Sequence, residues 1–167
     1  MSANTDPAVA EKSNAEKAYE AMKAQIGGEP VAGEWFELTQ ERINDFADAT
    51  LDHQFIHVDP ERAAQTPFGG PIAHGFLTLS MLVHLSGTIP NDLPPMEGLL
   101  MGVNYGMNKV RFINPVPAGS RIRATAQVTD VTLKGNSVDQ IRNMTVEIEG
   151  SDKPALIAEW IGRTVFA

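Results

Sequence analysis

The feature that most constrains the fold of this chain is a change of hydrophobic pattern near its middle. Apolar residues cover nearly the whole circumference of a helix predicted over Ile72–Ser86, and a helix that is apolar on all sides is a buried helix. After Gly98, apolar and polar residues alternate, which predicts strands at 99–113, 121–133, 138–149 and 155–166. Short turns join these strands, as in an antiparallel meander. We therefore expect an α+β fold in which an antiparallel sheet wraps around a long central helix.

The beginning of the chain divides into a polar tail and the start of a domain. Residues 1–12 are polar and are expected to form a disordered tail. Residues 13–167 are expected to form a single domain, since a chain of this length is typical of one hydrophobic core. Apolar residues recur at helical spacing over about 13–27, which predicts an N-terminal helix stopped by glycine.

Capping signals place two further helices before the central one. A first strand is predicted at 34–38, and Thr39 is a good N-cap for a helix over 40–49. Asp59 can cap a short helix that has Pro60 in its first position. The segment between these two helices is therefore expected to be a loop.

Composition excludes several classes of function. With a net charge of −8, the chain lacks the clustered basic residues of a nucleic-acid-binding protein. It has no apolar run long enough to cross a membrane and no pattern of a signal peptide. The absence of cysteine removes disulfides and thiol nucleophiles, and it fits a reducing, cytoplasmic location.

The candidate proton-transfer groups lie in the predicted loop. Asp52 and His57 are five residues apart, so they can cooperate only if the chain folds back on itself. A histidine and a nearby carboxylate commonly move a proton to or from water. Spacing alone allows a purely structural interpretation as well, in which Asp52 caps a turn and His57 packs at a helix start.

Two further features can bind a ligand. The unpaired N–H groups at the start of the central helix can face a ligand oxygen, and Gly75 would let that oxygen approach closely; the glycine can equally serve only close packing. His74 and His84 are interpreted as hydrogen-bonded structural histidines. Lys109 and Arg111 share one face of a strand and can meet phosphates or form a solvated surface.

The order of these motifs resembles a known family. The segments 46–62, 67–69 and 72–79, with Asp52-His-Gln-Phe-Ile-His57 and Ile72-Ala-His-Gly75, are similar to the hydratase-2 motif of MaoC-like dehydratases, the R-specific enoyl-CoA hydratases with a hot-dog fold. The segment 104–121 is similar to the strand that follows the central helix in that family. The resemblance covers about residues 33–167 and is greatest for the single-domain branch that includes the NodN-like proteins.

The resemblance implies a specific reaction and site. Asp52 and His57 take the catalytic positions and activate one water, and Gly75 supplies the N–H that holds the thioester oxygen. The substrate is then a trans-2-enoyl-CoA and the product a (3R)-hydroxyacyl-CoA, with no metal and no other cofactor. A homodimer is also implied, with Lys109, Arg111 and Arg121 as candidate contacts for the phosphates of CoA.

Three departures from the family pattern concern the same site. The residue before the catalytic aspartate is Leu51, where the family usually has glycine; Gln54 and Phe55 stand where the common motif has Asn-Pro; and Val83 stands where some members have serine. If the family glycine needs a positive φ, leucine strains this loop. Two alternatives therefore remain: an acyl-CoA thioesterase, and a hot-dog protein that binds acyl thioesters without catalysis.

Overall fold

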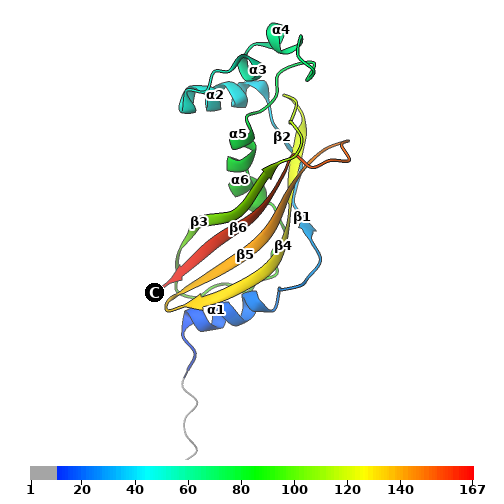
Figure 1. The fold of residues 1–167 in the computed structure, drawn as a ribbon. Helices are drawn as coiled ribbons and strands as arrows, with labels where there is room; N and C mark the ends of the chain where they lie inside the picture. Colours follow the sequence, from blue (N-terminus) through cyan, green and yellow to red (C-terminus); the bar gives the residue numbers. More distant parts are fainter. Residues whose placement is uncertain (1–10) are drawn as a thin grey trace, which may run out of the picture.

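A computed structural model describes residues 11–167, and its core is one antiparallel sheet that curves around a pair of short helices (Figure 1). The helices are α1 (Asn14–Lys23), α2 (Gln40–Thr50), α3 (Phe55–Val58), α4 (Pro60–Ala63), α5 (Gly75–Ser80) and α6 (Leu82–Ser86). The strands are β1 (Val31–Ala32), β2 (Phe36–Glu37), β3 (Leu99–Phe112), β4 (Arg121–Lys134), β5 (Ser137–Ile148) and β6 (Leu156–Phe166). The predicted tail at 1–12 lies almost entirely outside the described residues.

The predicted capping residues act as caps. The side chain of Thr39 accepts a hydrogen bond from the N–H of Arg42 at 3.3 Å, and Asp59 accepts one from the N–H of Arg62 at 3.1 Å. Each bond satisfies one of the N–H groups that a helix start leaves unpaired. Within the range predicted for the first helix, α1 ends at Lys23, and Gly27 adopts a positive φ of 78° in the following turn.

The prediction of a simple meander is wrong for one strand. The sheet order is β1-β4-β5-β6-β3, with β2 pairing separately with β4. β4, β5 and β6 form a meander, but β3 pairs with β6 at the opposite edge from β1 rather than with β4. The connection after β3 therefore crosses from one edge of the β4-β5-β6 meander to the other. The sequence could not show this, because the alternation of apolar and polar residues identifies strands but not their partners.

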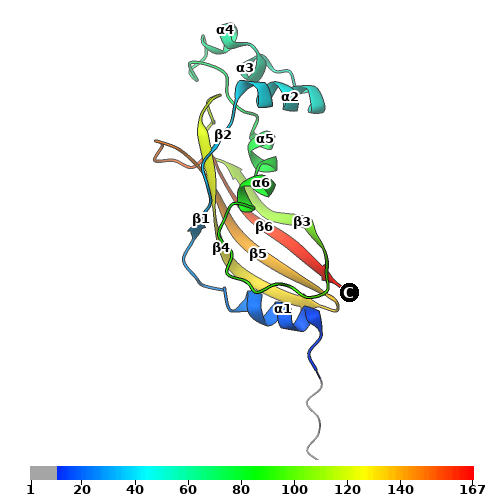
Figure 2. The same ribbon diagram turned by 180° about the vertical axis from the view of Figure 1, so that it is seen from behind.

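The central helix is shorter than predicted and is divided. Ile72 and Ala73 are extended, because Ile72 forms a β-bridge with Pro117 and the N–H of Ala73 donates to the carbonyl of Val116 at 2.8 Å. Helix α5 therefore begins only at Gly75, and Met81 separates it from α6. The two helices run along one face of the sheet, whereas α2, α3 and α4 lie together beyond its end (Figures 1 and 2).

The helix is also not buried on all sides. Phe76 is 69% exposed and Val83 is 55% exposed, although Leu77, Leu82 and Leu85 are buried against the sheet. The apolar pattern predicted a helix that is covered all round, but within one chain the edge strand β3 leaves one side open.

The apolar residues form two clusters on the face of the sheet that the helices cover. The larger one lies between α5–α6 and the sheet and includes Leu82, Met144 and Trp160. The smaller one lies under α1 and includes Met22 and Val138. No helix among residues 11–167 is long and apolar enough to span a membrane.

Candidate active site

The site begins where α2 ends. Leu51 terminates the helix in the left-handed conformation, with φ 62° and ψ 21°, and it is the one non-glycine residue with a positive φ in the described part of the chain. Its side chain is 82% exposed, so no packing holds it there. This reversal of the chain direction places Asp52 immediately after the helix, where its side chain is exposed and its carboxylate accepts a hydrogen bond from the N–H of Gln54 at 3.4 Å.

The strained turn gives a testable expectation for stability. A left-handed conformation costs an L-residue about 1–2 kcal/mol, whereas glycine loses only about 0.5–1 kcal/mol through its greater freedom in the unfolded chain. Leu51→Gly is therefore expected to raise the free energy of unfolding by up to about 1 kcal/mol, measured by urea denaturation. The control Ala49→Gly, in the last turn of α2, should lower it by about 1 kcal/mol. A Leu51→Gly protein that is less stable than wild type would show that this turn is not strained.

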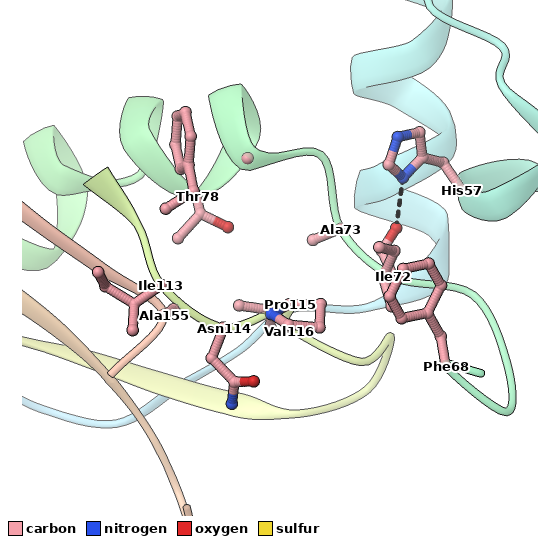
Figure 3. Close-up of a pocket in the computed structure, with 12 residues that line it drawn as sticks. His57, Phe68, Ile72, Ala73, Thr78, Ile113, Asn114, Pro115, Val116 and Ala155 are labelled. Carbon is pink, nitrogen blue, oxygen red and sulfur yellow. Dashed lines mark hydrogen bonds between the residues drawn. The ribbon is translucent and has the colours of Figure 1, made fainter. Parts of the chain in front are cut away.

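His57 is held by an extended segment that precedes the central helix. It lies on the one-turn helix α3, which corrects the prediction that it lies on a loop. Its Nδ1 is 2.7 Å from the carbonyl oxygen of Ile72, and the N–H of Ile72 donates to the carbonyl of Ile56 at 3.0 Å. From the other side, the amide of Gln40 on α2 donates to the carbonyl of His57 at 2.7 Å. Figure 3 shows the imidazole directed toward Ile72.

The hydrogen bond to Ile72 determines which nitrogen of His57 can accept a proton. A carbonyl oxygen only accepts hydrogen bonds, so Nδ1 must carry the hydrogen and Nε2 of the neutral ring has a free lone pair. Burial lowers the pKa of His57 below its usual value; the bond to Ile72 and the charge of Asp52 oppose this, and His74 adds to it. His57 is 7% exposed, and this burial favours the neutral ring, in which Nε2 is the acceptor nitrogen.

The lowered pKa predicts the pH dependence of the reaction. Because protonation of His57 removes its acceptor, the acidic limb of the kcat/KM profile should have its midpoint below about pH 6.5, the usual pKa of histidine. Folding also favours neutral His57, so its contribution to stability is complete above that pH and is lost as the pH falls through the window below it. If the wild-type profile has its acidic midpoint above pH 6.5, and a His57→Gln protein lacks that midpoint, the pKa of His57 is not lowered and this prediction is wrong.

His74 is the residue of the site that the sequence underestimated. It is 3% exposed, its ring stacks on that of His57 with centroids 3.9 Å apart, and its Nε2 donates to the backbone carbonyl of Asp52 at 2.9 Å. It is hydrogen-bonded, as predicted, but it also joins the two predicted catalytic residues. One ligand atom from each of Asp52, His57 and His74 lies within 4.8 Å of the other two, a span that one water can bridge with ordinary hydrogen bonds.

A cavity of about 340 Å³ adjoins this cluster (Figure 3). His57 and Gly75 both line it, together with the mainly apolar residues Phe68, Ile72, Ala73, Thr78, Phe112, Ile113, Asn114, Pro115, Val116 and Ala155. Gly75 is the first residue of α5, where helix geometry leaves N–H groups unpaired. A Cβ on Gly75 would lie 3.0 Å from the ring of Phe112, so a larger residue would push that ring away.

The predicted CoA contacts do not line this cavity. Lys109 pairs with Glu159 at 2.9 Å, Arg121 pairs with Glu149 at 2.9 Å, and Arg111 donates to the carbonyl of Val110. Lys109 and Arg111 line a separate hollow of about 360 Å³ on the sheet. Val83 does not line the catalytic cavity either. One subunit therefore brings His57 together with Asp52 in the cluster and with Gly75 in the cavity, whereas Asp52 and the three basic residues do not line that cavity.

Comparison with known proteins identifies the family. A family model described as "MaoC like domain" matches residues 21–151. The 3-hydroxyacyl-thioester dehydratase Z of Mycobacterium tuberculosis is 51% identical over 144 residues, which cover 85% of this chain and 93% of that protein. Nodulation protein N of Rhizobium meliloti is 48% identical over 149 residues, which cover 87% of this chain and 89% of that one. A monoamine oxidase regulatory protein from Archaeoglobus fulgidus superposes with a TM-score of 0.67 at 27% identity, covering 84% and 90% of the two chains.

The fold and site define a hot-dog protein with a buried histidine beside a carboxylate. The chain belongs to the MaoC-like dehydratase family, an enzyme class that adds water to, or removes it from, its substrates. The resemblance inferred from the ordered motifs is thereby confirmed, as is the α+β hot-dog fold.

Proposed function

We propose that this protein catalyses the reversible, R-specific hydration of trans-2-enoyl-CoA to (3R)-hydroxyacyl-CoA. The observation that carries the proposal is the buried His57: one of its ring nitrogens lies within 4.8 Å of the carboxylate of Asp52, and His57 also shares a cavity with Gly75. The cavity is mainly apolar, which suits an acyl chain. The identity to a protein named a 3-hydroxyacyl-thioester dehydratase supports the same chemistry.

In this mechanism one water binds between Asp52 and His57. Nε2 of His57 accepts a hydrogen bond from the water and directs its oxygen toward C3 of the substrate, where the new C–O bond forms. The carboxylate of Asp52 takes up the proton that the water releases and returns it to C2, so H and OH are both supplied by one water molecule. The N–H of Gly75 donates to the thioester oxygen, which becomes more negative as the double bond is lost.

The carrier part of the substrate is proposed to extend from this cavity toward the basic residues of the sheet. The phosphates of CoA require cationic partners, and Arg111 is adjacent in sequence to Phe112, whose ring covers Gly75. We keep Lys109, Arg111 and Arg121 as the proposed phosphate contacts. The ion pairs of Lys109 and Arg121 lie at the surface and are therefore weak, so a phosphate can replace them.

We also propose that the functional unit is a homodimer formed along β3. This strand is an edge of the sheet, and a long apolar edge strand is a template for pairing with another chain. Its exposed apolar side chains are Leu99, Leu100, Met101, Val103, Tyr105, Met107 and Phe112. The exposed side of the central helix continues this surface, because the rings of Phe76 and Phe112 are 5.7 Å apart. A second copy paired at this edge would cover both.

The test is an assay with crotonyl-CoA that follows the absorbance of the enoyl thioester. Hydration predicts a loss of this absorbance with no free thiol, and an (S)-specific 3-hydroxyacyl-CoA dehydrogenase should not oxidise the product. Release of free CoA would instead identify a thioesterase. Binding without any change in absorbance would identify a non-catalytic acyl-thioester-binding protein. A series of enoyl-CoA chain lengths would then define the range that the cavity accepts.

The proposed reaction uses only side chains and water. Dialysis against a chelator should leave the rate unchanged, because no step needs a metal or redox cofactor. The cytoplasm is the proposed location, in agreement with a chain that contains no cysteine.

A further inference from the structure

The sheet contains one half-buried arginine that has no acidic partner among the described residues. Arg142 lies on β5, on the same face as the core residues Met144 and Val146, and its Nε is buried without a hydrogen-bond partner. None of the carboxylates of residues 11–167 forms an ion pair with it. Its guanidinium lies 4.7 Å from the centre of the Trp160 ring. Burial alone lowers the pKa of Arg142.

The other arginines of β4 and β6 show how unusual this is. Arg121, Arg123 and Arg163 pair with Glu149, Glu147 and Asp139 at 2.9, 2.5 and 2.6 Å. Partial burial of a charge has a cost in free energy that a counter-ion reduces, and proteins normally pair such groups. Arg142 therefore differs from these arginines in that no described carboxylate neutralises its half-buried charge.

A second cavity begins at this arginine. It measures about 430 Å³, within the range of small-molecule sites, and it shares no lining residue with the cavity at His57. Gln140, one pleat away on β5, also lines it, and its Nε2 is buried without a hydrogen-bond partner. Two side chains that each have a buried, unsatisfied nitrogen therefore line one cavity.

The other residues that line this second cavity indicate which kind of ligand it can bind. Val31, Ile89, Leu93, Ala126 and Val128 are apolar, and the cavity lies beyond the end of α6, away from Gly75 at the start of α5. The only acidic side chain among its lining residues is that of Glu29, which is exposed. One cation suits a singly charged group better than a phosphate, which carries about −1.5 to −2 at pH 7. The planar guanidinium also matches a carboxylate geometrically.

From this arrangement we propose that the cavity beneath β4 and β5 is a second ligand site, separate from the catalytic one, which binds a monocarboxylate with an apolar chain. Its carboxylate accepts hydrogen bonds from Arg142 and Gln140. Its chain lies against the apolar walls. Such a ligand would supply the counter-ion that Arg142 lacks.

Octanoate is a suitable probe, and Trp160 is a built-in reporter. The chain has two tryptophans, so Trp35→Phe leaves only Trp160, next to Arg142. We expect octanoate to change the fluorescence of this protein in a saturable way. Arg142→Met in the same background should weaken binding at least about tenfold, the equivalent of 1.4 kcal/mol. Arg123→Met in this background should bind as the Trp35→Phe protein does, since Arg123 is also a half-buried arginine of the sheet but lies outside the cavity.

Three further measurements make the result decisive. Arg142→Met should be at least as heat-stable as wild type without ligand, because it removes an unpaired, half-buried charge. Gln140→Leu should also weaken octanoate binding. This second variant tests the site even if the Arg142→Met protein is unstable. Octanol and inorganic phosphate should bind more weakly than octanoate. Octanoate that does not bind, that binds Arg142→Met as tightly as wild type, or that binds no better than phosphate would overturn the proposal.

Discussion

Replacing His57 with alanine is expected to lower kcat for crotonyl-CoA hydration by about a thousandfold, within the range of losses typical for a general acid or base. The substitution removes Nε2, the acceptor that orients the water. It also leaves the carbonyl of Ile72 without the 2.7 Å bond from Nδ1. Asp52→Asn should cause a loss of similar size, because a neutral amide has nearly the same shape as the carboxylate but cannot take up the proton.

The neighbouring histidine provides the matched control for these variants. His53 is exposed and its Nε2 forms a hydrogen bond with the carboxylate of Asp48 at 2.7 Å, and such exposed contacts contribute little. His53→Ala should therefore keep the wild-type rate. Circular dichroism and urea denaturation would show that the Asp52→Asn and His57→Ala proteins are folded. If both retain the full rate, the catalytic assignment is wrong.

The second large effect is expected at the proposed dimer edge. Phe76→Glu combined with Val83→Glu places two carboxylates on the exposed side of the central helix in each subunit. Their desolvation and mutual repulsion should raise the dissociation constant at least about a hundredfold, the equivalent of 2.7 kcal/mol. Light scattering should then report the 18.1 kDa mass of one chain, where the wild type gives twice that mass.

A distant apolar residue tests whether any added charge has this effect. Ile26 is 40% exposed and follows α1, away from β3. Ile26→Glu should remain dimeric, and the double variant should keep a normal circular dichroism spectrum. A wild-type protein that is monomeric at micromolar concentration would exclude the proposed dimer.

Local signals in the sequence predicted local structure well. Thr39 and Asp59 cap helices as expected, because a cap depends on bonds within one turn of the chain. The boundaries of β3 to β6 also fell close to their predicted ranges. The choice of partner strand was not predicted, since β3 and β6 are joined by hydrogen bonds between residues far apart in sequence.

The geometry around the candidate site residues was not predicted. The pattern from Asp52 to His57 singled out both groups as candidates, but it gave no sign that Nδ1 of His57 would form a hydrogen bond with the carbonyl of Ile72. The start of the central helix was placed at Ile72 because its side chain is apolar. Only the structure shows that the backbone there pairs with Pro117. His74 appeared to be one more structural histidine because a stacking contact leaves no periodic signal.

The backbone of Ile72 has a consequence for how this enzyme can change. Its N–H and carbonyl both hold α3, it lines the cavity at His57, and Gly75 follows three residues later. His57 and the proposed thioester contact at Gly75 are therefore held by one continuous segment. We expect a substitution that widens the cavity at Ile72 to shift the basicity of the His57 imidazole as well, so under the proposed mechanism substrate range and pH optimum should evolve together.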